Sequence, residues 1–185
     1  MKLFRTNEID TDTYQVGDVI SFTLTDGENV EAMAVKQEQD GMIFCLVDCL
    51  ADEYAMNKED SNRGGYWASD LRDVLNGEIL DRVPADLREK LLPFENGDLL
   101  RIPTEREISG ENIYGETDDK EQWEPMKDRR NRIAFQGSKT GTWEWYWLMN
   151  RVKGSAALFA LVYDTGYANS YYASYSIGVR PAFKI

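Results

Sequence analysis

The chain of 185 residues contains no histidine. Its absence removes the commonest general base, the commonest ligand of transition metals and every Ser-His or Cys-His nucleophile. The sequence also has no glycine-rich phosphate loop, no EF-hand calcium loop and no CxxC pair. Carboxylate pairs alone can hydrolyse glycosides, but 33 acidic residues bring such pairs together by chance. We therefore expect a protein that is not an enzyme and that holds no metal and no cofactor.

Cysteine is scarce as well. The two cysteines, Cys45 and Cys49, lie four residues apart in the run MIFCLVDCL. In a strand their Cα atoms would be about 13 Å apart, too far for a disulfide bond. We interpret both as small packing residues.

Long apolar runs are absent. No window approaches the roughly 18 apolar residues of a membrane-spanning helix. The opening MKLFRTNEID has no apolar run typical of a secretory signal. We expect no signal peptide, no membrane contact, and a chain that works in the cytoplasm or in a particle assembled in a cell.

The net charge of −12 is unevenly distributed. Residues 143–185 carry four basic and two acidic side chains, so the acidity lies in residues 1–142. Such a body repels phosphate backbones and anionic membranes, so we expect no nucleic-acid partner. The basic cluster Arg129-Arg130-Asn131-Arg132 is expected to be salt-bridged or solvated.

The first third of the chain alternates strand-like runs with turn signals. Asp26-Gly27 and Asp40-Gly41 separate three runs rich in β-branched and aromatic residues, at 19–24, 30–37 and 42–50. An Asp-Gly pair in this position is a strong hairpin signal, because glycine adopts a positive φ at no steric cost. The pattern predicts an antiparallel β-meander over about 18–50.

A helix pair is predicted over about 69–92. Ser69 is a favourable N-cap for apolar residues at helical spacing, and Asn76-Gly77 is a point of interruption. The second helix is expected to begin near Pro84 and to stop at Pro93. Residues 109–124 have no periodicity and abundant acid, so they predict a long surface loop.

The C-terminal part is rich in aromatic residues and predicts strands at 143–149, 158–163 and 177–185. Trp143, Trp145 and Trp147 alternate as one face of a strand would, so we expect them in the core, with sugar stacking as the alternative. Pro181 cannot donate to a strand ladder and should lie at an edge or an irregularity. We expect Arg180 to pair with a carboxylate that closes the fold, and a ligand-binding role is the alternative.

Residues 154–178 hold five of the ten tyrosines together with serine, alanine and glycine, and a single charge, Asp164. Tyrosine offers a large amphipathic contact at low entropic cost, and this mixture is typical of binding surfaces. The alternative is that the tyrosines pack a half-buried sheet, for which β-propensity suffices.

Four segments, YWASDLRDVLNGEIL (66–80), KDRRNRIAF (127–135), WYWLMN (145–150) and GVRPAFKI (178–185), resemble a domain family of unknown function from gut bacteria and their phages. Its members end in Tyr-Trp-Leu-Arg-Ser followed by Gly-Val-Arg-Pro-Ala. The resemblance runs from Val-Gly-Asp at 16–18 to the end of the chain. The family in turn resembles the C-type-lectin-like fold of formylglycine-generating enzymes and of the variable proteins of diversity-generating retroelements.

The resemblance implies a phage particle as an alternative location to the cytoplasm, and a C-terminal binding surface that mutagenesis can diversify. Two departures limit it. Met149-Asn150 stands where the family has Arg-Ser, which suits a position that varies. The late cysteine pair of the formylglycine-generating enzymes is missing, so that activity is not implied.

We therefore predict one α+β domain over residues 1–185, with a C-type-lectin-like fold, antiparallel sheets, two flanking helices and long irregular loops. Its C-terminal region 143–185 would present a protein or glycan ligand site. The alternatives are a prophage assembly protein that uses the same surface between subunits of an oligomer, and an enzyme of unrecognised type. The predicted ligand-binding residues are Met149, Asn150, Arg151, Tyr163, Thr165, Tyr167, Asn169, Ser170, Tyr171, Tyr172 and Tyr175.

Overall fold

The computed structural model of the chain describes residues 13–137 and 141–185. The segment MKLFRTNEID, on which the expectation about a signal peptide rests, lies outside the described residues. Within them the chain is mixed α+β, with mostly antiparallel sheets and few, short helices. The α+β class is thus confirmed.

The predicted meander forms. Strands β1 (Val19–Thr23), β2 (Asn29–Gln37) and β3 (Met42–Leu46) pair antiparallel in sequence order. Gly27 takes a φ of 96° in the first hairpin, as the Asp-Gly signal requires. The third strand ends at Leu46 rather than near residue 50.

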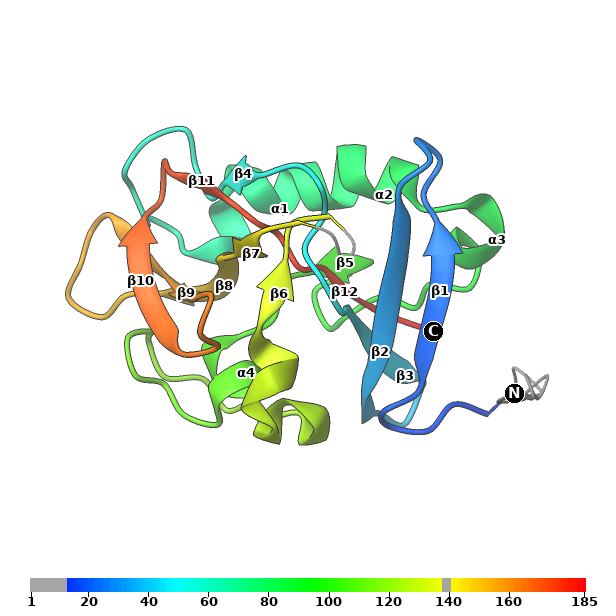
Figure 1. Ribbon diagram of the computed structural model, residues 1–185. Helices are drawn as coiled ribbons and strands as arrows, with labels where there is room; N and C mark the ends of the chain where they lie inside the picture. The colour runs from blue at the N-terminus through cyan, green and yellow to red at the C-terminus, as the bar shows by residue number, and fades with distance from the viewer. Residues whose placement is uncertain (1–12, 138–140) are drawn as a thin grey trace.

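The last strand of the chain completes this sheet from far away in the sequence. Strand β12 (Ala182–Lys184) lies between β3 and β5 (Leu100–Arg101), in the order β1-β2-β3-β12-β5. The segment before β12 crosses the molecule from the side of β10 to this sheet (Figure 1). Non-local pairing of this kind leaves no signal in local sequence patterns.

A second sheet has the order β10-β9-β8, with β8 (Tyr146–Arg151), β9 (Leu158–Val162) and β10 (Ala168–Tyr172). Two small sheets join β4 (Tyr54–Ala55) to β11 (Ser176–Ile177), and β6 (Ala134–Phe135) to β7 (Trp143–Glu144).

The predicted strand 143–149 is therefore two strands, because β7 pairs with β6 whereas β8 pairs with β9. The three tryptophans do not share a core face: Trp143 is 65% exposed, Trp145 is half-buried and Trp147 is buried. Tyr146, expected on the opposite face, is buried too. The strand predicted at 177–185 is also divided, and Pro181 lies directly before β12, at the predicted irregularity.

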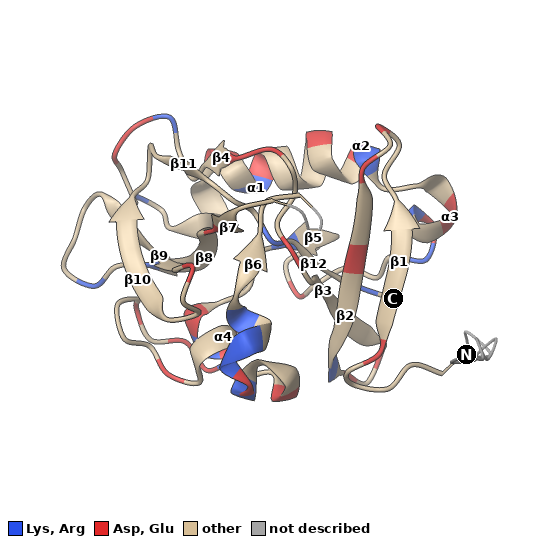
Figure 2. Cartoon of the chain, in the orientation of Figure 1, with Lys and Arg blue, Asp and Glu red and all other residues tan. Residues whose placement is uncertain are grey.

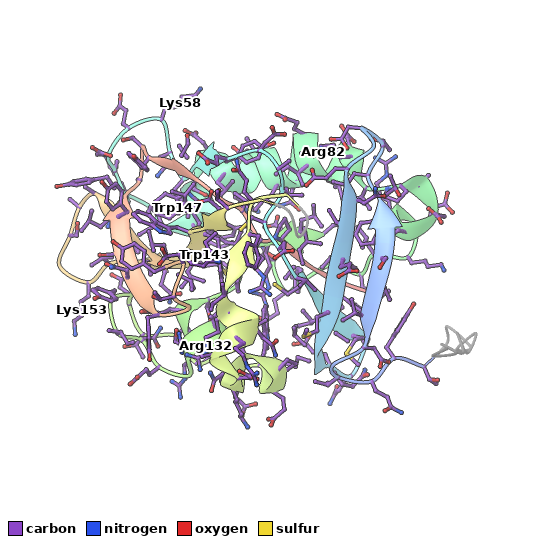
Figure 3. All side chains as sticks on the ribbon, in the orientation of Figure 1. Lys58, Arg82, Arg132, Trp143, Trp147 and Lys153 are labelled. Atoms are coloured by element: carbon purple, nitrogen blue, oxygen red, sulfur yellow. The ribbon has the colours of Figure 1, made fainter. Side chains whose placement is uncertain are left out.

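The first predicted helix forms over residues 70–82 as α1 (Asp70–Val74), a π-helical turn η2 (Leu75–Ile79) and α2 (Leu80–Arg82). The Ser69 side chain accepts the Arg72 amide hydrogen, so the N-cap is confirmed. Arg82 fixes the end of the helix on the β1–β2 turn through Asp26 and Glu28, both at 2.6 Å (Figure 3).

The second predicted helix is shorter than expected. Helix α3 (Ala85–Arg88) ends four residues before Leu92, whose amide instead donates to the Lys184 carbonyl at 2.8 Å. Pairing with the sheet thus outweighs the helical spacing of the leucines.

The sequence did not predict the short turn η1 (Tyr66–Ala68) before Ser69. It also did not predict three later helical segments, α4, η3 and η4. Helix α4 (Glu105–Ser109) starts with a capping box formed by Thr104 and Glu107. The predicted loop 109–124 follows it and runs to η3 (Glu124–Lys127), and η4 (Arg129–Arg132) contains the basic cluster.

Strands β3 and β8 of the two main sheets are buried on both faces, between two hydrophobic clusters. In β3, Phe44 belongs to one cluster, and Cys45 belongs to the other. In β8, Trp147 and Tyr146 divide in the same way. Each sheet therefore supplies one face to each cluster, which locks the two sheets together.

Arg180 is 1% exposed and bridges these parts. Its guanidinium donates to the carbonyl of Leu46, to the carbonyl of Asn131 at 3.0 Å and to the Tyr146 hydroxyl at 3.2 Å. The predicted carboxylate partner is thus wrong: two carbonyls and a hydroxyl receive these bonds. The close crossing of β3, η4 and β8 around the C-terminal segment supplies the acceptors.

The first prediction concerns Arg180→Ala. Loss of the guanidinium leaves buried acceptors without a donor, so the free energy of unfolding should fall by about 3 kcal/mol. Urea unfolding measures this change. Arg130→Ala is the control, because the Arg130 side chain is 84% exposed beside Asp128, and should leave the midpoint unchanged. Equal midpoints for Arg180→Ala and the parent would contradict the structural role.

The second prediction concerns the thiols. Cys45 and Cys49 are free and buried, as predicted, and burial raises the pKa of Cys45 to about 11 and that of Cys49 well above its usual value. Below the pKa of an unfolded thiol, about 8.5, both folded thiols keep their protons. Their stabilising contribution is lost as the pH rises from there towards 11. At pH 8, a thiol reagent should therefore label the protein only after urea unfolds it, and rapid labelling of the native chain would contradict the packing role.

Candidate functional site

Five aromatic side chains beside β10, the edge strand of the three-stranded sheet, form a continuous group that we call the tyrosine surface. The ring of Trp145 lies 4.4 Å from that of Tyr163 and 6.0 Å from that of Tyr171, centre to centre. Tyr171 in turn lies 4.8 Å from Tyr175 and 5.8 Å from Tyr172. All four contacts are edge-to-face, a geometry that aromatic rings prefer.

The tyrosine surface has an inner and an outer row. Trp145, Tyr163 and Tyr171 are half-buried and pack on the hydrophobic cluster that contains Phe44 and Trp147. Tyr172 and Tyr175 are each 52% exposed. Packing of a half-buried sheet therefore explains the inner row but not the outer one.

Local structure places the outer row. Tyr172 is the last residue of β10, where the chain turns, and its ring lies within contact of that of Tyr171 rather than on the opposite face of the strand. The amide of Tyr175 donates to the carbonyl of Tyr172 at 3.0 Å, and this tight turn brings the ring of Tyr175 back onto Tyr171.

Two other predicted residues, Thr165 and Tyr167, lie in the β9–β10 hairpin. The Arg129 guanidinium donates to the Thr165 carbonyl and lies 5.0 Å from the ring centre of Tyr167, which is 59% exposed. Tyr167 makes no described ring contact with the tyrosine surface.

The basic cluster in η4 gathers at the helical turns below β6 (Figure 2). Arg130 pairs with Asp128 at 2.9 Å, as expected. Arg129 and Arg132 instead bind backbone carbonyls, those of Thr165 and Met126. The expectation of salt bridges or solvation thus holds for Arg130 and for Arg129, which is exposed, but not for the half-buried Arg132.

Asn169 and Ser170 lie half-buried in β10, opposite Leu161 and Ala160 of β9. The Asn169 side chain accepts the amide hydrogen of Ser170. Both residues belong to the same strand as Tyr171 and Tyr172, so they flank the tyrosine surface.

Met149, Asn150 and Arg151 lie elsewhere. They end β8, at the other edge of the three-stranded sheet, where they line a cavity of about 670 Å³. Arg151 and Tyr171 are both paired with Phe159, from its two sides. The structure thus divides the predicted ligand-binding residues between two edges of one sheet.

Asn150 is 9% exposed and holds this edge together. Its side chain accepts from the Glu105 amide at 2.7 Å and donates to the Glu116 carbonyl at 2.9 Å and to the Asp118 carboxylate at 2.8 Å. Three such bonds from a buried side chain favour a structural role for Asn150 beside its place in the lining of the cavity.

The cavity, which we call the Trp67 pocket, contains residues that the sequence did not single out. Arg101 and Glu107 form a buried ion pair at 2.6 Å in its wall, and Phe94 covers the guanidinium at 4.6 Å from the ring centre. Trp67 from η1 is 51% exposed at the same cavity. The spacing Thr104-x-x-Glu107 predicts a helix start, but nothing local indicates that Arg101 and Trp67 line one cavity.

Within residues 13–137 and 141–185, no group of three or more cysteine, aspartate or glutamate side chains is arranged to hold a metal ion. In the same part of the chain, none of the helices combines the length and the apolar character needed to cross a lipid bilayer. Comparison of the chain with protein-family models, with curated proteins and with solved structures finds no match.

The third prediction concerns Asn150→Ala. The change leaves the Glu105 amide and the Glu116 carbonyl without their partner, so the free energy of unfolding should fall by about 2 kcal/mol. The loop at 110–118 should also exchange its amide hydrogens faster. Asn169→Ala is the matched control on β10 and should change neither quantity appreciably. If Asn150→Ala unfolds like the parent, Asn150 has no structural role.

Proposed function

We propose that the chain is a non-catalytic binding module and that the tyrosine surface recognises a protein partner. The observation that supports this most is the outer row, in which two tyrosines about half exposed rest on a packed aromatic layer. Exposed aromatic area is unfavourable for an isolated domain unless a partner covers it.

The inner row makes the outer row suitable for binding. Tyr171, itself packed against Trp145, holds the rings of Tyr172 and Tyr175 by edge contacts, so less side-chain freedom is lost when a partner binds. Tyrosine also presents a hydroxyl that donates and accepts, which suits the polar and apolar mixture of a protein surface.

The edge strand adds a second means of contact. Among residues 13–137 and 141–185, β10 is the end strand of its sheet and pairs with β9, so its outer side offers backbone donors and acceptors to a partner. The backbone together with the tyrosines favours a protein over a glycan at this surface.

We further propose that the fold is C-type-lectin-like and related to the bacterial and phage family that the sequence resembles. The buried positions of Gly178 and Arg180 support this, because a signature that closes the fold would be shared by proteins with different ligands. A Cβ on Gly178 would lie 2.5 Å from Glu144 and 2.7 Å from Cys49, so glycine is required there. Diversification of the tyrosine tract would appear in the genome as a reverse transcriptase gene beside a near-copy of the 3′ end that differs at adenines.

The fourth prediction is that Tyr172→Ala and Tyr175→Ala, singly and together, weaken partner binding and spare the fold. Each change should cost about 1–2 kcal/mol of binding free energy, roughly a 5- to 30-fold rise in Kd, and shift the Tm by no more than about 2 °C. Partners are captured from host-surface protein extracts, purified, and titrated against each variant by calorimetry.

Tyr114→Ala is the matched control, because Tyr114 is 36% exposed but lies in the loop after α4. It should bind like the parent. Unchanged affinity of the Tyr172 and Tyr175 variants would contradict the proposal. Self-association of the parent in sedimentation, abolished by the same two changes, would instead favour the subunit of a prophage assembly.

A further inference from the structure

The Trp67 pocket is a second candidate site, at the opposite edge of the three-stranded sheet from the tyrosine surface. Its volume of about 670 Å³ is in the range of small-molecule sites, about 300–1,000 Å³. It combines aromatic side chains, Tyr66, Trp67 and Phe94, with amides and charged groups. Such a mixture of apolar area and a few converging polar groups is characteristic of ligand pockets.

The lining contains four basic and six acidic residues, so carboxylates are in excess. Each of its four basic residues forms an ion pair with an acidic residue of the same lining: Lys36 with Glu38, Arg101 with Glu107, Lys120 with Glu95 and Arg151 with Glu116. Two carboxylates, those of Asp118 and Asp119, remain outside these four pairs, and that of Asp118 accepts from the side chains of Asn112 and Asn150.

These ion pairs and the remaining carboxylates limit the charge that a ligand of the pocket can carry. An anionic ligand would have to break an existing pair to gain a counter-charge, and it would meet two further carboxylates. A neutral ligand with hydroxyl groups can use the remaining lone pairs and N–H groups without breaking any. The lining therefore disfavours an anion, and its two remaining carboxylates suit a ligand with several hydroxyl donors.

Trp67 is held ready for stacking. Its ring meets that of Tyr66 edge-on at 5.2 Å, and the Arg72 guanidinium, fixed by Asp98 at 2.7 Å, lies 5.8 Å from the ring centre. Half of Trp67 nevertheless remains exposed.

The loop before Trp67 requires its glycines. Gly64 and Gly65 have φ angles of 81° and 65°, and a Cβ on Gly64 would lie 2.6 Å from that of Ala68. The backbone conformation that presents Trp67 therefore depends on these two glycines, because other residues rarely adopt a positive φ.

We propose that the Trp67 pocket binds a neutral saccharide. The C–H face of a sugar ring packs on the exposed part of Trp67 by dispersion, while the ring hydroxyls bond to the Glu116 and Asp118 carboxylates and to the Asn96 amide. This site is independent of the protein-binding role proposed for the tyrosine surface, because it shares no residue with it.

The experiment titrates the full chain with four neutral probes, maltotriose, mannotriose, chitotriose and lactose, by tryptophan fluorescence and calorimetry. At least one probe should bind with a saturable change in fluorescence. Trp67→Ala should weaken that probe at least tenfold, and Trp67→Phe, which keeps a ring, should retain part of the affinity.

Trp143→Ala is the matched control, because Trp143 is 65% exposed on β7, outside the pocket, and should bind like the parent. Tyr172→Ala should also leave saccharide binding unchanged, which separates this proposal from the tyrosine surface. Three outcomes would overturn it: no binding of any probe to the folded parent, binding that survives Trp67→Ala, or binding of spermidine or citrate in competition with the saccharide.

Discussion

The buried guanidinium of Arg180 holds the two main sheets in place relative to each other. It donates to β3 of the five-stranded sheet through Leu46, to η4 through Asn131 and to β8 of the three-stranded sheet through Tyr146. A positive charge at 1% exposure is tolerated only where several acceptors surround it. The surrounding backbone can supply them only if β3, η4 and β8 all meet at this point, so the cation makes their arrangement specific.

The segment that carries Arg180 also positions both of the proposed binding regions. Just before it, β11 pairs with β4 and the Gly178 amide donates to the Trp145 carbonyl at 2.9 Å. Trp145 is thereby fixed as the base of the tyrosine surface. Just after it, β12 aligns β5, and Arg101 of β5 forms the buried pair with Glu107 in the wall of the Trp67 pocket. Loss of the crossing segment would disturb both regions together.

The two regions differ in how they offer polar groups. In the Trp67 pocket the four basic side chains are paired, two carboxylates remain, and both N–H groups of the Asn150 amide are used, so the proposed selectivity rests on shape and on the remaining acceptors. At the tyrosine surface the tract carries a single acidic residue, and exposed rings provide the contact area. Lys153 projects outward from the loop between β8 and β9, at the rim of the molecule, as Lys58 does on its own loop (Figure 3).

The sequence by itself determined the features that depend on neighbours along the chain. These are the Asp-Gly meander, the Ser69 cap, the unpaired cysteines, the irregularity at Pro181 and the concentration of tyrosines after residue 160. Tertiary structure alone decided the rest. Alternation could not show that Trp143 and Trp147 belong to different sheets, because pairing with β6 or with β9 decides which residues are covered. Nor could residue type show that Asn150 is a structural link and Trp67 an exposed platform, because the partners of Asn150 lie 32 to 45 residues away and the cavity exists only once β5, α4 and β8 have met.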